Sequence, residues 1–176
     1  MTVTTLADDA AELAEMAGLV LDAGQRQVLR DGMGRTADGR WAAPAVRGAD
    51  QAVLLARELA GLFLLDERIL HAAGEYTVMA AAFRRAAEAV TSCGEMRRRV
   101  KRMTYANGAE GIELVSGARA RFVASRVRAT FAPWDFLRGY ACDCLITEGL
   151  ASLGEDTAGL LPCVARRPDP QAWYGW

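Results

Sequence analysis

Long apolar runs, a basic leader and a cysteine framework are all missing from this sequence. No apolar stretch reaches the length of about 18 residues that a membrane-spanning helix needs, so we expect no contact with a membrane. The stretch Met1–Glu15 is acidic and lacks the basic start of a secretory signal peptide. The four cysteines, Cys93, Cys142, Cys144 and Cys163, follow no disulfide spacing. We therefore predict a cytoplasmic protein.

Lysine and histidine are each represented once. The 21 basic residues comprise twenty arginines and the single Lys101, and the one histidine is His71. A metal site built on a histidine needs partners at ligand spacing, and Cys142 and Cys144 are too close together for a zinc knuckle. We expect His71 to be a packed residue at the end of a strand, and we predict no metal site.

The remaining composition is that of a globular protein. The chain has 176 residues, of which 52% are hydrophobic and 24% are charged. These proportions exclude wholesale disorder, and the length allows one domain with its own hydrophobic core. Because neither an internal repeat nor a low-complexity linker divides the chain, we predict that residues 1–176 form a single domain.

Charge is unevenly distributed along the chain, although the net charge is only −1. Residues 84–138 contain twelve basic residues against five acidic ones, a net of +7, whereas both flanking segments are net acidic. We name the densest group of positive charges the basic cluster, which comprises Arg97, Arg98, Arg99, Lys101 and Arg102. Such a cluster suits a phosphate backbone such as that of DNA, and the alternative is a solvated arginine-rich surface.

Apolar periodicity and turn signals predict helices that alternate with short strands. The expected helices are Thr5–Ala17, Asp22–Gly32, Gln51–Leu65, Tyr76–Thr91 and Thr157–Val164. The expected strands are Arg68–Ala73, Asp143–Thr147 and one that begins near Ala172, together with hairpin strands at Val100–Tyr105, Gly111–Leu114 and Arg119–Ser125. This alternation favours an α/β fold with a largely parallel sheet flanked by helices.

Several segments together resemble a known family. They read LVLDAGQRQVLRDGMG, DGRWAAPAV, ARELAGLFLLDERILHAAGEYTVMAAAFRR, RRRVKRMTYANGAEGIELVSGARARFVA, RGYACDCLIT and LLPCVARRPDPQAWYGW. From about Gly18 to Trp176 the chain resembles the N-terminal packaging-ATPase domain of the terminase large subunit of actinobacterial phages. The resemblance implies a P-loop-NTPase-like fold and an ancestor that used ATP and Mg²⁺ to drive DNA into a prohead. We expect the RNase-H-like nuclease domain of that family to be absent here.

The phosphate-binding loop implied by this resemblance is reduced. Such a loop joins a strand to a helix, and it holds nucleotide phosphates and Mg²⁺ with glycine amides, a lysine and a serine or threonine. The corresponding interval, VRGADQAVLL, contains one glycine and no lysine, serine or threonine. Arg47 and Gly48 are the candidates for a remnant of the loop. We expect the loop to be missing or remodelled and the strand before it to be lost.

The resemblance assigns roles to three further residues. Glu148 stands near the acidic pair that ends a strand in the family, where one acid holds Mg²⁺ and the other orients the attacking water, and Gly149 lacks that second carboxylate. Gln25 matches the glutamine that reads the adenine edge, and Arg138 matches an arginine position next to phosphate. The alternatives are an exposed strand-end acid for Glu148 and an ordinary surface side chain for Gln25.

The segment Ser125–Tyr140 is longer than its counterpart in the family and carries Phe131, Trp134 and Phe136. We expect these aromatic side chains to pack over the gap left by the phosphate loop. The alternative is that they stack on single-stranded bases.

The sequence therefore predicts a terminase large-subunit-like protein of phage or prophage origin, descended from a DNA-packaging ATPase but inactive and without a bound cofactor. A second hypothesis is a non-catalytic module that contacts double-stranded DNA, portal proteins or other terminase chains through the basic cluster. A third is a remnant that folds poorly because it exposes apolar surface.

Overall fold

The chain forms five helices and seven strands in the part that the computed structural model describes, which is residues 5–106, 108–124, 137, 139–149 and 165–175. The helices are α1 (Leu6–Met16), α2 (Ala23–Met33), α3 (Gln51–Phe63), α4 (Tyr76–Ser92) and α5 (Gly94–Arg99). The strands are β1 (Ala45–Ala49), β2 (Arg68–Ala73), β3 (Val100–Thr104), β4 (Gly111–Leu114), β5 (Arg119–Ala124), β6 (Cys144–Glu148) and β7 (Gln171–Gly175).

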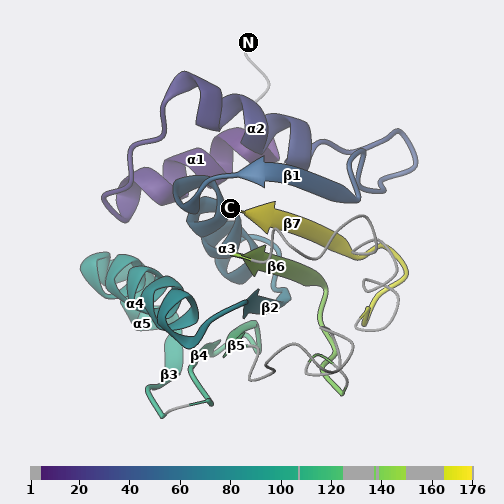
Figure 1. The fold of residues 1–176 in the computed structure, drawn as a ribbon. Helices are drawn as coiled ribbons and strands as arrows, with labels where there is room; N and C mark the ends of the chain where they lie inside the picture. The colour runs from purple at the N-terminus through teal and green to yellow at the C-terminus, as the bar shows by residue number, and fades with distance from the viewer. Residues whose placement is uncertain (1–4, 107, 125–136, 138, 150–164, 176) are drawn as a thin grey trace.

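All seven strands belong to one sheet in the order β1-β7-β6-β2-β5-β4-β3 (Figure 1). The pairs from β1 to β5 are parallel, and β5, β4 and β3 continue the sheet in antiparallel fashion. The predicted α/β fold with a largely parallel sheet is therefore confirmed. The two apolar runs predicted as strands do lie side by side, with Ile69 of β2 opposite Cys144 of β6 and Ala73 opposite Glu148.

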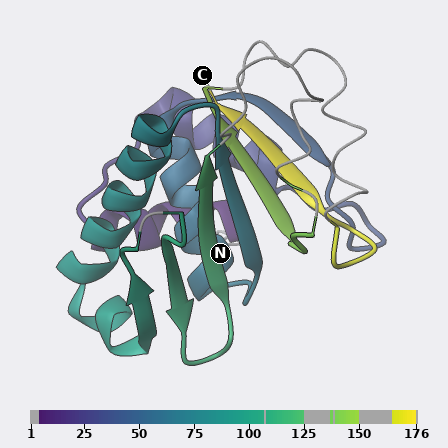
Figure 2. The same cartoon turned by 60° about the horizontal axis from the view of Figure 1, so that its bottom comes forward.

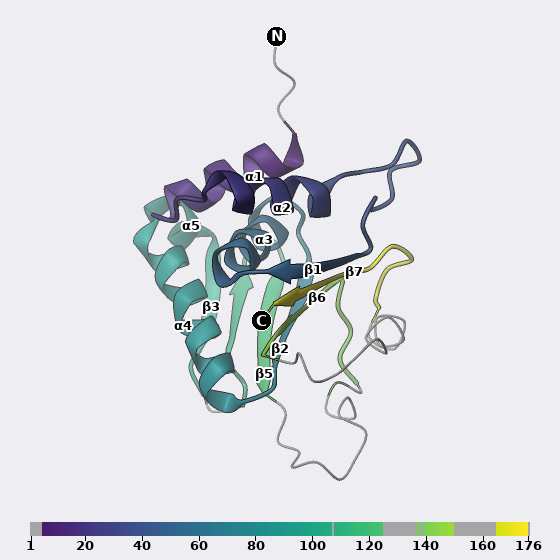
Figure 3. The same ribbon diagram turned by 45° about the horizontal axis from the view of Figure 1, so that its top comes forward.

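The described helices are arranged in two layers (Figure 3). α3 and α4 pack against the strands, and α1 and α2 pack on α3, with α2 also touching β1. α3 is buried from Val53 to Phe63, as the sequence predicts for a helix that is apolar on most faces. The core therefore lies between α3, α4 and the sheet.

Side-chain caps determine where three of the helices begin. Capping boxes start α1 and α2, with Thr5 and Asp22 as the N-cap residues. Asp50 caps α3, because its Oδ1 accepts a hydrogen bond of 2.9 Å from the N–H of Val53. These side-chain oxygens satisfy amides that the first turn of a helix leaves without partners.

Strand β1 corrects one prediction. We expected the strand before α3 to be lost, but Ala45–Ala49 forms β1 and pairs in parallel with β7. Its signal in the sequence is weak, because only Val46 and Ala49 are buried and because Gly48, with a φ of +73°, interrupts the register. The strand is present, and Asp50 is the single residue between it and α3.

One helix was not predicted, and two predictions fall on residues that the structure does not describe. α5 is a short helix that the sequence analysis did not anticipate, and three of its six residues are arginines. The predicted helix Thr157–Val164 and the predicted packing of Phe131, Trp134 and Phe136 lie outside the described residues. Among the described residues, none of the helices is both long enough and apolar enough to cross a membrane.

Candidate functional site

The carboxyl ends of the parallel strands are where open α/β sheets bind ligands. Here β6 ends at Glu148, β2 carries His71 near its end, and β1 leads into the N-terminus of α3. A P-loop has the same strand–loop–helix arrangement as β1 and α3. The candidate site therefore comprises the end of β6 and the β1–α3 connection.

Glu148 is buried and is held by side chains from three different elements. Its side chain is 1% exposed. The Gln51 Nε2 donates to Oε1 at 2.7 Å, and one Arg85 nitrogen donates to Oε1 at 3.0 Å and to Oε2 at 2.7 Å. His71 Nε2 lies 3.4 Å from Oε2. The alternative of an exposed strand-end acid is wrong, because α3 and α4 cover this end of β6 with their own polar side chains.

His71 links Glu148 to a second buried carboxylate. Its Nδ1 is in hydrogen-bond contact with Glu58 of α3, and its ring stacks on Phe122 of β5 with 5.3 Å between the centroids. Burial alone lowers the pKa of His71, but the carboxylates of Glu58 and Glu148 outweigh burial and raise that pKa to about 9. The imidazole therefore carries a positive charge at neutral pH.

The same charges act on Glu148. Burial raises the pKa of its carboxyl group, but the hydrogen bonds and positive charges of His71 and Arg85 have the larger combined effect and lower it. Glu58, His71, Glu148 and Arg85 thus form a chain of alternating charge, which we name the Glu148 network. Its two carboxylates and two cations balance each other.

The sequence points to Glu148 and His71, but it does not point to their partners Glu58, Arg85 and Gln51. The adjacent charged residues Arg57 and Glu58 inside an otherwise apolar helical run were the available signal, since buried charges are found mainly where they are paired. No sequence pattern indicates which partner they meet.

The β1–α3 connection holds a carboxylate where a phosphate loop would hold an anion. Asp50 accepts the N–H of Val53 through Oδ1, and its Oδ2 accepts a hydrogen bond of 2.7 Å from Gln25 Nε2. A helix N-terminus favours negative charge, which is why phosphates bind there. In this chain the Asp50 side chain supplies that charge, and Asp50 is the single residue between β1 and α3.

The other residues assigned from the resemblance have different surroundings. Both ends of the Gln25 amide are engaged, because Oε1 accepts the Asp22 N–H at 2.8 Å and Nε2 donates to Asp50. Arg47 and Gly48 lie within β1 rather than in a loop, and the Arg47 guanidinium is 5.2 Å from the centroid of the Tyr174 ring. Arg138 lies outside the described residues.

The residues present do not fit a magnesium–nucleotide complex. Glu148 has protein donors on both oxygens, and Gly149, with a φ of +68°, provides no side chain beside it. Among the described residues, no group of three or more histidine, cysteine or acidic side chains is arranged to hold a metal ion. Cys142 and Cys144 are buried free thiols, and burial raises the pKa of Cys142 to about 12.

The basic cluster is divided between α5 and β3, and some of its side chains are already engaged in contacts within the protein. Arg99 donates to the Phe63 carbonyl at 3.1 Å, and Lys101 forms an ion pair of 2.7 Å with Glu113. Arg97, Arg98 and Arg102 are exposed and form no ion pair within the described part of the chain.

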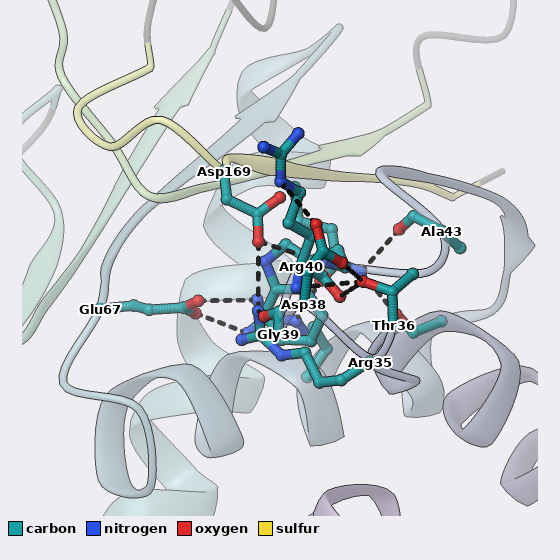
Figure 4. A network of polar contacts seen from close by, with 12 residues as sticks. Arg35, Thr36, Asp38, Gly39, Arg40, Ala43, Glu67 and Asp169 are labelled. Atoms are coloured by element: carbon teal, nitrogen blue, oxygen red, sulfur yellow. Dashed lines mark hydrogen bonds and ion pairs between the residues drawn. The ribbon is translucent and has the colours of Figure 1, made fainter.

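A second polar network lies at the opposite, amino ends of the parallel strands (Figure 4). Buried Arg57 forms a two-point ion pair with Glu67, at 2.7 and 3.1 Å. Asp169 accepts hydrogen bonds from the Trp41 N–H at 3.0 Å and from Arg35 at 3.2 Å, which ties the turn before β7 to the segment before β1. These contacts pair the charges internally, so we assign this network a structural role.

No protein-family model and no curated protein matches this chain. Among solved structures, the crystal structure of the HK97 bacteriophage large terminase aligns with a TM-score of 0.61 and 11% sequence identity, over 88% of this chain and 32% of that chain. The ATPase domain of the Thermus phage P74-26 large terminase aligns with a TM-score of 0.47 and 19% identity, over 92% of this chain and 66% of that chain. A mutant of that ATPase domain aligns with a TM-score of 0.48 and 18% identity, over 92% of this chain and 67% of that chain.

The chain therefore spans about a third of the HK97 protein, with which it shares little sequence. What the two have in common is the fold, an α/β sheet flanked by helices, and this is the fold of a phage large terminase.

Proposed function

We propose that this chain is a terminase large-subunit-like protein of phage or prophage origin that has lost the ATP chemistry of a packaging motor. The fold shared with a phage large terminase supports the origin. The observation that carries the loss of chemistry is the environment of Glu148, whose buried carboxylate accepts hydrogen bonds from Gln51 and Arg85 and lies 3.4 Å from His71 Nε2.

Two physical effects oppose nucleotide binding at this site. A metal ion at Glu148 would have to displace the Arg85 guanidinium and the Gln51 amide, which already donate to the two carboxylate oxygens. Asp50 in addition places a negative charge beside the helix N-terminus that a nucleotide phosphate would need, so the two anions would repel each other.

Steady-state hydrolysis of ATP in the presence of Mg²⁺ tests this proposal. We expect the rate of hydrolysis by the chain, and by Glu148→Ala, to match a control without protein. Turnover above the control that disappears in Glu148→Ala would overturn the proposal.

A second candidate function is non-catalytic binding of double-stranded DNA, or of portal or terminase partners, through the basic cluster. The exposed positions of Arg97, Arg98 and Arg102 favour it. Binding to a phosphate backbone should be independent of sequence and should weaken steeply with salt. Replacing Arg97, Arg98 and Arg99 with alanine should lower the affinity for duplex DNA, and an unchanged affinity would exclude the α5 part of the cluster.

A further inference from the structure

The antiparallel end of the sheet carries arginines in register across its strands. Arg102 of β3 lies opposite Glu113 of β4, and Glu113 lies opposite Arg119 of β5. Gly111 of β4 lies opposite Arg121 of β5. Residues that face each other across a strand pair project to the same side of a sheet, so these arginines share one face.

This face is the one that the described helices leave open. The alternate residues Ile112, Ala120 and Phe122 are buried toward the helical side, whereas Arg119 and Arg121 are exposed. Figure 2 shows β3, β4 and β5 from this side with no helix drawn over them. A hollow of about 190 Å³ lies on the face, with Arg102, Arg119 and Arg121 among its lining residues. We name it the arginine face.

The two carboxylates near the hollow are already engaged. Glu113 accepts a hydrogen bond from Lys101, and this bond, together with the charges of Lys101, Arg102 and Arg119, lowers its pKa. Glu110 is buried and accepts the Gly108 N–H at 2.8 Å. Neither carboxylate forms an ion pair with the three arginines.

The guanidinium groups of the arginine face remain available to a ligand. Within the described residues, Arg102, Arg119 and Arg121 form no ion pair, and Arg121 lies over the ring of Tyr140 with 4.9 Å to its centroid. A guanidinium stacked on a ring keeps its in-plane N–H groups free for an anion, and arginine binds phosphate through two such groups at once.

We propose that the arginine face binds the phosphodiester backbone of a nucleic acid. The strand spacing places Arg102 and Arg119 about 10 Å apart, and Arg119 and Arg121 are about 7 Å apart along β5. Positive charges at such intervals match a linear polyanion better than one small anion. Among the described residues, none of the large exposed apolar side chains lines the hollow, which disfavours a peptide that would need an apolar anchor.

Gly111 contributes to the flatness of this surface. A Cβ at this position would approach the carbonyl oxygen of Ala120 to 2.9 Å, so a side chain here would require the strands to shift. The absence of a side chain leaves the space between Thr104 and Arg121 open to a ligand.

This inference deepens the second candidate function and rests on it, but it is independent of the loss of ATP chemistry. In this proposal the main contact with the nucleic acid is made by the arginines of β5 and not by those of α5. Contacts of this kind position a backbone and carry no sequence information.

Fluorescence anisotropy of the full chain with a labelled oligonucleotide, single-stranded in one arm and duplex in the other, tests the proposal. The test variant is Arg119→Glu with Arg121→Glu, and the matched control is Arg30→Glu with Arg40→Glu, which makes the same charge change at exposed positions outside both the arginine face and the basic cluster. In whichever arm binds, we expect the test variant to lose at least tenfold in affinity and the slope of log K against log salt to flatten by about 2. The control should stay within a few-fold of the unmodified chain.

Circular dichroism establishes that each variant is folded. If the charge reversal unfolds the chain, Arg119→Gln with Arg121→Gln replaces it and should still lower the affinity several-fold. Binding that the test variant retains at the level of the unmodified chain would overturn the arginine face and leave the second candidate function standing. Equal losses in both variants would also overturn it, as they would reflect net charge alone. No binding by the unmodified chain at low salt would overturn both.

Discussion

At the residue scale, the molecule is distinguished by charges that satisfy one another. Ala73 of β2 lies opposite Glu148 of β6, so His71, two residues before Ala73, projects to the same face of the sheet as Glu148. α3 and α4 supply the outer members of the network, Glu58 and Arg85. The Glu148 carboxylate is therefore part of the core.

The titration of His71 should be visible in the stability of the protein. Its pKa is about 9 in the folded chain, against about 6.5 when unfolded. A group whose pKa is raised by folding stabilises the fold fully when the pH is below its pKa in the unfolded chain. This stabilisation is lost as the pH rises through its pKa in the folded chain. Between about pH 7 and about pH 10, the free energy of unfolding should fall in the unmodified chain. We expect this fall to exceed that of His71→Gln by on the order of 3 kcal/mol. Urea denaturation at each pH measures this difference, and parallel curves for the two proteins would contradict the assignment.

Removing the charge of Glu148 should destabilise the fold. Glu148→Gln leaves His71 and Arg85 without one of their carboxylates in a buried site, and the expected cost is on the order of 3–5 kcal/mol. Glu113→Gln is the matched control, because it breaks the exposed pair with Lys101 and should cost less than about 1 kcal/mol. The two losses can be compared by urea denaturation at neutral pH. Equal and small losses would show that the Glu148 network contributes little.

At the scale of elements, the connection between β1 and α3 is the feature that supports the proposed loss of a phosphate loop. The strand and the helix are both present, but one residue, Asp50, joins them and caps the helix. A glycine-rich loop that wraps phosphates needs several residues with free amides. The scaffold of the site is therefore retained without the loop.

The cap itself can be tested by mutation. Asp50→Ala removes the acceptor of the Val53 N–H and the partner of Gln25, and we expect it to lower the free energy of unfolding by about 1–2 kcal/mol. Asp50→Asn keeps a capping oxygen and should retain most of the stability. If chemical denaturation gives the same free energy of unfolding for Asp50→Ala and the unmodified chain, the Asp50 cap does not stabilise the first turn of α3.

Several elements could be predicted from sequence, and others could not. The apolar runs of β2 and β6 and the apolar helix α3 have strong local patterns, and all three appear close to their expected bounds. β1 was missed because its glycine and exposed residues hide the pattern, and its strand character depends on pairing with β7, which is distant in sequence. The burial of Glu148 was missed for the same reason, since its partners come from α3, α4 and β2.

At the scale of the whole molecule, internal charge pairing occupies both ends of the parallel sheet. The amino ends hold the pair of Arg57 with Glu67, and the carboxyl ends hold the Glu148 network. Three exposed arginines without ion pairs, Arg102, Arg119 and Arg121, gather at the antiparallel end of the described sheet, whereas Arg47 lies by itself on β1 at the other edge. The proposed nucleic-acid contact therefore lies away from both internal networks.

The most direct test of the central claim is isothermal titration calorimetry of the chain with ATP and Mg²⁺. Under the proposed loss of ATP chemistry, in which Glu148 and Asp50 are already engaged by protein donors, we predict no binding heat beyond dilution and no rise in the melting temperature at millimolar nucleotide. Saturable binding that Glu148→Ala abolishes would contradict the claim that this site has lost its nucleotide.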